Sequence, residues 1–198
     1  MKNNFFNHIR KPETPFYYYD LDLLRKTLKR LQSIQERYGY QLHYAVKANA
    51  NSRIMKVVRE HNLGADCVSG NEILHAIENG FNTDEMVYAG VGKSEREIDL
   101  ALDHNIEFFN CESIPEIEVI NERASIKNKK ARIALRINPD VKANTHHYIT
   151  TGIEENKFGI NRSSLDEVIQ TCSKLDWIDL KGLHFHIGSQ IRDMDVFK

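Results

Sequence analysis

The sequence "YQLHYAVKANAN", residues 40–51, alternates polar and apolar residues as a half-buried β-strand does. His43 and Lys47 fall on one face of this strand, and Tyr44 and Val46 fall on the other. Small and amide residues follow Lys47 at once, as they do where a strand turns into a loop. A lysine at the end of such a strand is therefore the first candidate functional residue.

Similar strand-like runs recur at a near-constant step, about the length of a short βα unit with its turns. Helical patterns fill the intervals, and an earlier helix ends at Gly39. This alternation predicts parallel strands joined by right-handed crossovers. The expected strands are centred in residues 40–48, 64–69, 85–90, 106–111, 131–138 and 180–189.

The expected helices have recognisable start signals. Ser94 with Glu97 and Ser164 with Glu167 have the spacing of a capping box, in which the serine and the glutamate cap each other's backbone N–H groups. Pro115 lies within the first turn of another helix, a position that favours proline.

Two architectures fit these elements, an open doubly wound sheet and a (β/α)8 barrel. No GxGxxG follows the first strand, which disfavours dinucleotide binding. Arg136 in "IALRIN" and His184 and His186 in "LHFHI" lie on polar strand faces opposite apolar ones, which favours a barrel. Only six strands are recognised where a barrel has eight, so we expect an incomplete α/β barrel of the (β/α)8 type, in the N-terminal part of a longer protein.

Composition excludes several classes of function. The net charge of −1 gives no basic surface for nucleic acid or an anionic membrane. No apolar run approaches the length of a membrane span or of a signal-peptide core. The three cysteines are widely separated and form no CxxC pair, so we expect a reducing, cytoplasmic location.

The chemistry is expected at the carboxyl ends of the strands, where barrel active sites lie. Lys47, Arg136 and His186 fall there on the inward face, and a lysine among apolar walls can act as an amine nucleophile. Gly188 and Ser189 form a turn that can hold an oxyanion or a phosphate. A nucleophilic lysine, an anion site and a flat ring partner together indicate pyridoxal 5′-phosphate.

The pair formed by His184 and His186 also has the spacing of two metal ligands on one strand. No acidic ligand stands out nearby, so we predict no metal site. His184 is instead expected to be a packed, hydrogen-bonded interior histidine.

The chain resembles the fold-type III, pyridoxal-phosphate-dependent decarboxylases, in particular their diaminopimelate branch. The resemblance covers nearly the whole chain, in family order, and "THHYITTGIEENKFGI" with "HIGSQI" is the part specific to that branch. The matching segments are "TPFYYYD" (14–20), "YAVKANAN" (44–51), "GADCVSGNEI" (64–73), "YAGVGKSEREI" (88–98), "LRINPDV" (135–141), "THHYITTGIEENKFGI" (145–160) and "GLHFHIGSQI" (182–191).

The resemblance implies a role for each of several residues. Lys47 would hold pyridoxal phosphate covalently, His186 would stack on its ring, and Ser189 would bind its phosphate. Asp66, Glu72 and Arg136 match polar positions that line the cofactor site in related ornithine decarboxylases. The implied reaction is decarboxylation of meso-2,6-diaminopimelate to L-lysine and CO2.

The resemblance also implies parts that this chain lacks. A Gly-rich phosphate loop, a carboxylate partner for the pyridine nitrogen, and a Cys and a Tyr that cross a homodimer interface belong to the later half of the family's chain. Residues 1–20 would join a β-domain built mainly from that half, and residues 21–198 would form part of the barrel. We therefore expect the chain alone to be inactive.

Three alternatives remain open from the sequence. One is a related decarboxylase of ornithine, arginine or carboxynorspermidine. Another is a non-catalytic pyridoxal-phosphate carrier made of a single barrel, although "TPFYYYD" argues against it. The third is a barrel metallohydrolase that uses His184 and His186.

Overall fold

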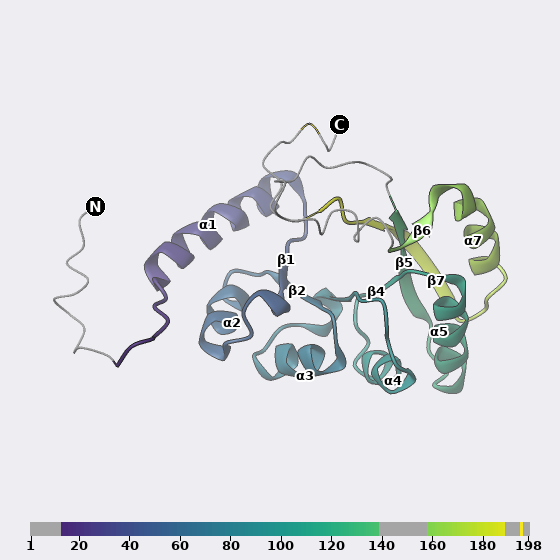
Figure 1. The fold of residues 1–198 in the computed structure, drawn as a ribbon, viewed down its shortest axis with the longest axis horizontal. Helices are drawn as coiled ribbons and strands as arrows, with labels where there is room; N and C mark the ends of the chain where they lie inside the picture. The colour runs from purple at the N-terminus through teal and green to yellow at the C-terminus, as the bar shows by residue number, and fades with distance from the viewer. Residues whose placement is uncertain (1–12, 139–157, 189–194, 196–198) are drawn as a thin grey trace.

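A single parallel sheet with helices packed against it forms the molecule (Figure 1). The computed structural model describes residues 13–138, 158–188 and 195. The strands are β1 (His43–Ala45), β2 (Gly64–Cys67), β3 (Met86–Tyr88), β4 (Phe108–Cys111), β5 (Ala131–Asn138), β6 (Ile160–Asn161) and β7 (Ile178–Phe185). The helices are α1 (Leu21–Tyr38), α2 (Ser52–Arg59), α3 (Gly70–Glu78), α4 (Glu95–Asp103), α5 (Ile114–Ile126) and α7 (Leu165–Cys172), with 3₁₀ turns η2 (Val46–Ala48), η3 (Thr83–Glu85) and η4 (Arg162–Ser164).

The strands follow chain order, and all the pairs between described strands are parallel. Strands β4 and β6 pair with different parts of β5, and β7 pairs along most of its length. All six expected strands are therefore present, and the expectation of parallel strands is confirmed. The short strand β6 was not expected, because a two-residue strand gives no periodic pattern.

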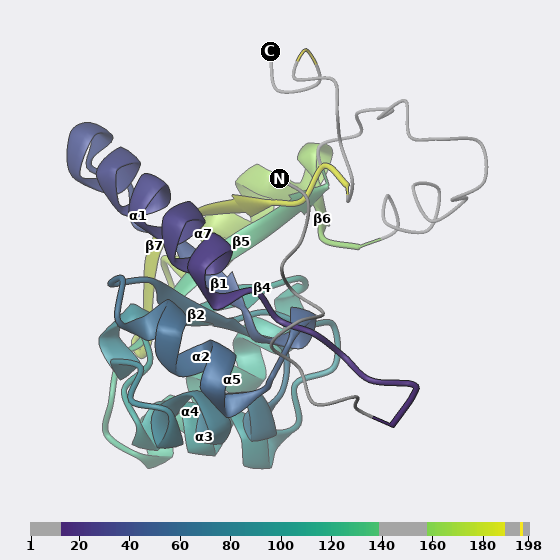
Figure 2. The same ribbon diagram turned by 90° about the vertical axis from the view of Figure 1, so that its left-hand side faces the viewer.

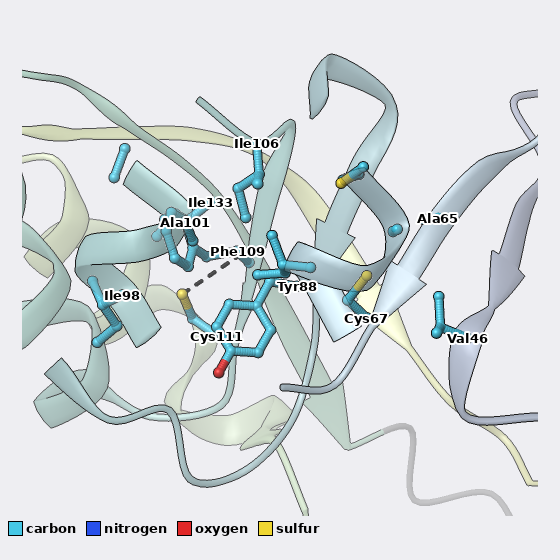
Figure 3. Packing of buried hydrophobic residues seen from close by; sticks show 14 of the residues in the cluster. Val46, Ala65, Cys67, Tyr88, Ile98, Ala101, Ile106, Phe109, Cys111 and Ile133 are labelled. Atoms are coloured by element: carbon cyan, nitrogen blue, oxygen red, sulfur yellow. Dashed lines mark hydrogen bonds between the residues drawn. The ribbon is translucent and has the colours of Figure 1, made fainter. Parts of the chain in front are cut away.

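The helices α2, α3, α4 and α5 form an arc on one side of the sheet (Figure 1), and in the view turned by 90° they again lie on one side of the strands (Figure 2). Their apolar stripes are buried, as for Ile98, Ala101 and Leu102 of α4. In the core between the helices and the sheet, Cys67, Tyr88 and Cys111 from neighbouring strands lie side by side (Figure 3). The apolar strand face thus points to the helices, as expected for a barrel wall.

Of the two predicted capping boxes, the one at Ser94 is present and the one at Ser164 is not. The side chain of Ser94 accepts a hydrogen bond from the Glu97 N–H and the Glu97 side chain accepts one from the Ser94 N–H, so the first capping box is confirmed. The capping box expected at Ser164 is wrong, because no hydrogen bond caps α7 through the Ser164 side chain. Residue 164 belongs to the turn η4 and has helical backbone angles, whereas a capping residue is extended.

Candidate active site

Lys47 lies just beyond β1, in the 3₁₀ turn η2, and its side chain is exposed in the part of the chain that the structure describes. The expectation that it ends a strand among apolar walls is therefore wrong in detail. The strand stops at Ala45, and the Tyr44 hydroxyl donates a hydrogen bond of 3.0 Å to the Asn49 carbonyl oxygen across the turn. This turn places Lys47 at the carboxyl end of the sheet, next to Asp66, whose register partner is Ala45.

Asp66 of β2 is the point around which several candidate residues gather. Its Oδ1 atom is buried and has no hydrogen-bond partner among the described residues. Burial raises the pKa of the Asp66 carboxyl, and the positive charges of Lys47 and His43 oppose that rise. Glu72 and His186 lie near enough to shift the same pKa. The structure therefore brings Lys47, Asp66, Glu72 and His186 together.

Glu72 has a second contact that the sequence did not suggest. Its Oε2 atom accepts a hydrogen bond of 2.7 Å from the Val68 N–H, while the Ser69 side chain caps α3. One carboxylate oxygen of Glu72 thus fixes the loop between β2 and α3.

Arg136 lies near the carboxyl end of β5, and its guanidinium is held by a carboxylate. Its Nη1 donates a hydrogen bond of 2.7 Å to Glu112 Oε1, with the two side chains only 14% and 8% exposed. The Phe158 ring packs against the guanidinium, and the ring centroid lies 5.7 Å from Cζ of Arg136. Sequence reasoning missed Glu112, because an acidic residue after a strand usually faces solvent.

His184 and His186 come from β7 and the residues after it. His184 is the register partner of Arg136. Burial lowers the pKa of His184 to about 4, and the charges of Arg136, His186 and Lys93 act in the same direction. His184 was expected to be a packed, hydrogen-bonded interior histidine, but its Nδ1 atom is buried without a hydrogen-bond partner among residues 13–138, 158–188 and 195.

A cavity of about 460 Å³ is lined by residues of β1 to β5 and β7. Asp66 and His184 line it, together with His43, Phe108 and Asn110. Two polar atoms without partners among the described residues therefore belong to residues of one concave surface, which is a chemical environment suited to a polar ligand.

Ser189 lies outside the described residues. Among the residues that the structure describes, no group of three or more His, Cys, Asp or Glu side chains is arranged to bind a metal ion. None of the described helices is both long and apolar enough to cross a membrane.

A family model described as "Pyridoxal-dependent decarboxylase, pyridoxal binding domain" matches residues 24–198. The chain belongs to this family of pyridoxal-dependent decarboxylases. The family fold is a barrel, and this chain contains an incomplete one.

Relatives in the family are similar over nearly the whole chain. The diaminopimelate decarboxylase of Bacteroides thetaiotaomicron is 53% identical over 189 residues, which cover 95% of this chain and 49% of the relative. That of Aquifex aeolicus is 41% identical over 93% of this chain and 44% of its own length. The chain thus spans about half the length of the curated relatives that it matches.

Solved structures of decarboxylases are also similar over most of this chain and about half of their own length. The diaminopimelate decarboxylase of Helicobacter pylori in complex with L-lysine has a TM-score of 0.86 and 40% identity, over 96% of this chain and 48% of that one. The arginine decarboxylase of Paramecium bursaria Chlorella virus, at 24% identity and a TM-score of 0.70 over 87% of this chain and 44% of its own, shares the fold.

The site residues fit pyridoxal phosphate, the cofactor of this family. The Lys47 amine is a group that could react with the cofactor aldehyde, and the buried Oδ1 of Asp66 has an unused capacity to accept a hydrogen bond. His186 supplies a flat ring beside them.

Proposed function

We propose that the complete protein decarboxylates meso-2,6-diaminopimelate and releases L-lysine and CO2. The observation that carries this proposal is the 53% identity to a diaminopimelate decarboxylase over 95% of the chain. The gathering of Lys47, Glu72 and His186 around Asp66 supports the cofactor chemistry. The L-lysine complex of the similar Helicobacter pylori enzyme supports the choice of product.

In this proposal each residue acts on the cofactor or holds its site. Lys47 would hold the cofactor covalently through its amine, and the His186 ring would stack on the cofactor ring. The charges of Lys47 and His43 favour the ionised form of Asp66 against the effect of burial, so that its carboxylate can accept hydrogen bonds. Arg136 lines the site with its guanidinium fixed by Glu112. Ser189 binds the phosphate.

Bound pyridoxal phosphate supplies an electron sink for the electron pair left when the carboxylate departs as CO2. The residues of this chain orient that group and hold charges around it. A neutral His184 beside Arg136 adds no further positive charge at neutral pH.

Product analysis tests the proposed reaction. The complete purified protein is incubated separately with meso-diaminopimelate, ornithine, arginine and carboxynorspermidine, with Lys47→Ala as the inactive control. We expect L-lysine and CO2 from meso-diaminopimelate alone. Turnover of only one of the other amino acids would assign the protein to a related decarboxylase, and turnover of none with cofactor bound would favour a carrier.

We also propose that the complete protein is a cytoplasmic homodimer. Its organisation would be an N-terminal segment, residues 1–20, that joins a β-domain, followed by barrel residues 21–198. The three cysteines are buried and free, as is usual in a reducing compartment. Light scattering of the complete protein should give twice the mass of one chain, and the mass of a single chain would contradict the dimer.

A further inference from the structure

Lys93, in the loop between β3 and α4, is buried although it carries a charge. Its side chain is 1% exposed, and its ammonium donates hydrogen bonds to the carbonyl oxygens of Gly90 and Asn110, each 2.8 Å, and to Glu116 Oε1, 2.6 Å. The ring of Tyr88 lies 5.3 Å from the ammonium. All three donors of the lysine are used, which compensates for the cost of removing the charge from water.

Glu116 extends this contact toward the carboxyl end of β4. Its other oxygen, Oε2, accepts a hydrogen bond of 2.7 Å from the backbone N–H of Glu112. The carboxylate of Glu116 therefore joins the loop after β3 to the turn after β4. Because both oxygens are engaged, a shift of Lys93 would be transmitted to Glu112.

Glu112 is the residue that holds Arg136. Its backbone N–H binds Glu116, and its side chain accepts the hydrogen bond from the Arg136 guanidinium. Consecutive hydrogen bonds and ion pairs thus lead from Lys93 through Glu116 and Glu112 to Arg136. We call these four residues the Lys93 relay.

We propose that Lys93 is a positioning residue that, through Glu116 and Glu112, fixes the guanidinium of Arg136 at the cofactor site. This inference rests on the proposed place of Arg136 in that site. Lys93 itself does not touch the cofactor in this scheme. A buried charge whose partners are all oriented is suited to this role, because removing the carboxylate of Glu116 or Glu112 leaves a buried cation without its counter-charge.

The alternative is that Lys93 only holds the loops together. The two roles predict different results in a double-mutant cycle, because residues that act through one another are not additive. In the complete protein we would measure the dissociation constant of pyridoxal phosphate by absorbance titration for wild type, Lys93→Met, Arg136→Gln and the double variant.

We expect each single substitution to weaken binding by about tenfold, by analogy with residues that orient the ligands of metal sites. The double variant should bind no more weakly than Arg136→Gln alone. If the two losses multiply, or if Lys93→Met binds normally, the relay is wrong. If Arg136→Gln alone leaves binding unchanged, the proposed place of Arg136 fails as well, so the two failures are distinguishable.

Two further variants guard against a folding artefact. Glu112→Gln interrupts the relay next to Arg136 and should give the same non-additive loss if Lys93→Met fails to fold. Lys127→Met removes a different pair between α4 and α5, in which Nζ lies 2.7 Å from Asp103 Oδ1. This control should change the dissociation constant of pyridoxal phosphate by less than about twofold, since ion pairs at the protein surface contribute little to stability. A loss equal to that of Lys93→Met would overturn the relay.

Discussion

The position of Lys47 illustrates what single residues reveal about this site. The alternation of residues 40–51 predicted that Lys47 ends the first strand, but the strand stops at Ala45 and a 3₁₀ turn just beyond it carries Lys47. A turn of this kind depends on contacts such as that from the Tyr44 hydroxyl to Asn49, which leave no periodic signal in the sequence.

At the same scale, His184 should stay uncharged at pH values where a free histidine is protonated. Its pKa is lowered from 6.5 to about 4, chiefly by burial. Between pH 6.5 and about 4, His184 is protonated in the unfolded chain but neutral in the folded chain. The free energy of unfolding therefore decreases as pH falls through this range. NMR spectra of ring-labelled histidine, assigned with His184→Asn, should show a neutral ring at pH 5.5. A ring that titrates near 6.5 would contradict this prediction.

Some candidate site residues could be predicted from the sequence, and others could be found only in the structure. Residue type and strand position selected Lys47, Arg136 and His186 as candidates, because active-site side chains of barrels follow the ends of strands. The sequence did not point to Glu112 or Lys93, because what distinguishes them is the burial of their side chains against neighbouring βα units. Such burial is a tertiary property that the local pattern does not contain.

At the scale of helices, the two serines with the same spacing should differ in their effect on stability. Ser94→Ala removes a capping box and should cost about 1 kcal/mol. Ser164→Ala should cost less than about 0.3 kcal/mol, because the Ser164 side chain caps nothing. Thermal unfolding of the two variants in the complete protein checks this difference. Equal costs would contradict the assignment of a stabilising cap to Ser94 and not to Ser164.

At the scale of strands, Gly64 and Gly182 should differ in how well they tolerate a side chain. A side chain at Gly64 of β2 would collide with the Glu85 carbonyl oxygen and would lie 2.6 Å from Cδ2 of His43. Gly64→Ala should therefore destabilise the protein by roughly 1–3 kcal/mol. Gly182 of β7 has no other atom within 4 Å of such a side chain, and Gly182→Ala should be tolerated. Comparison of the two melting temperatures tests the packing between β1 and β2.

The order of the elements was predictable because each strand and helix contains its own local signal. Apolar runs ended by turn residues gave the six main strands, and Gly39 marked the end of α1, where it adopts a φ of 69°. The bounds of β1 were not predictable, because "YQLHYAVKA" is apolar enough for a longer strand than the three residues that pair.

At the scale of the whole molecule, the sheet is open at β1 and β7 within the described residues. Leu183 and Phe185 of β7 are 54% and 57% exposed, although they occupy the strand face that elsewhere packs against helices. We therefore expect the purified chain of residues 1–198 to produce no detectable L-lysine from meso-diaminopimelate. The complete protein, assayed in parallel, should produce it. Activity of the chain alone would contradict this expectation.

The central claim is that Lys47 anchors the cofactor, and one absorbance spectrum tests it most directly. The complete protein is incubated with pyridoxal phosphate and dialysed, as wild type, as Lys47→Ala and as Lys56→Ala, which changes an exposed lysine of α2. We predict that wild type and Lys56→Ala keep the band of lysine-bound pyridoxal, and that Lys47→Ala loses it. A band that persists unchanged in Lys47→Ala would remove Lys47 from the role assigned to it.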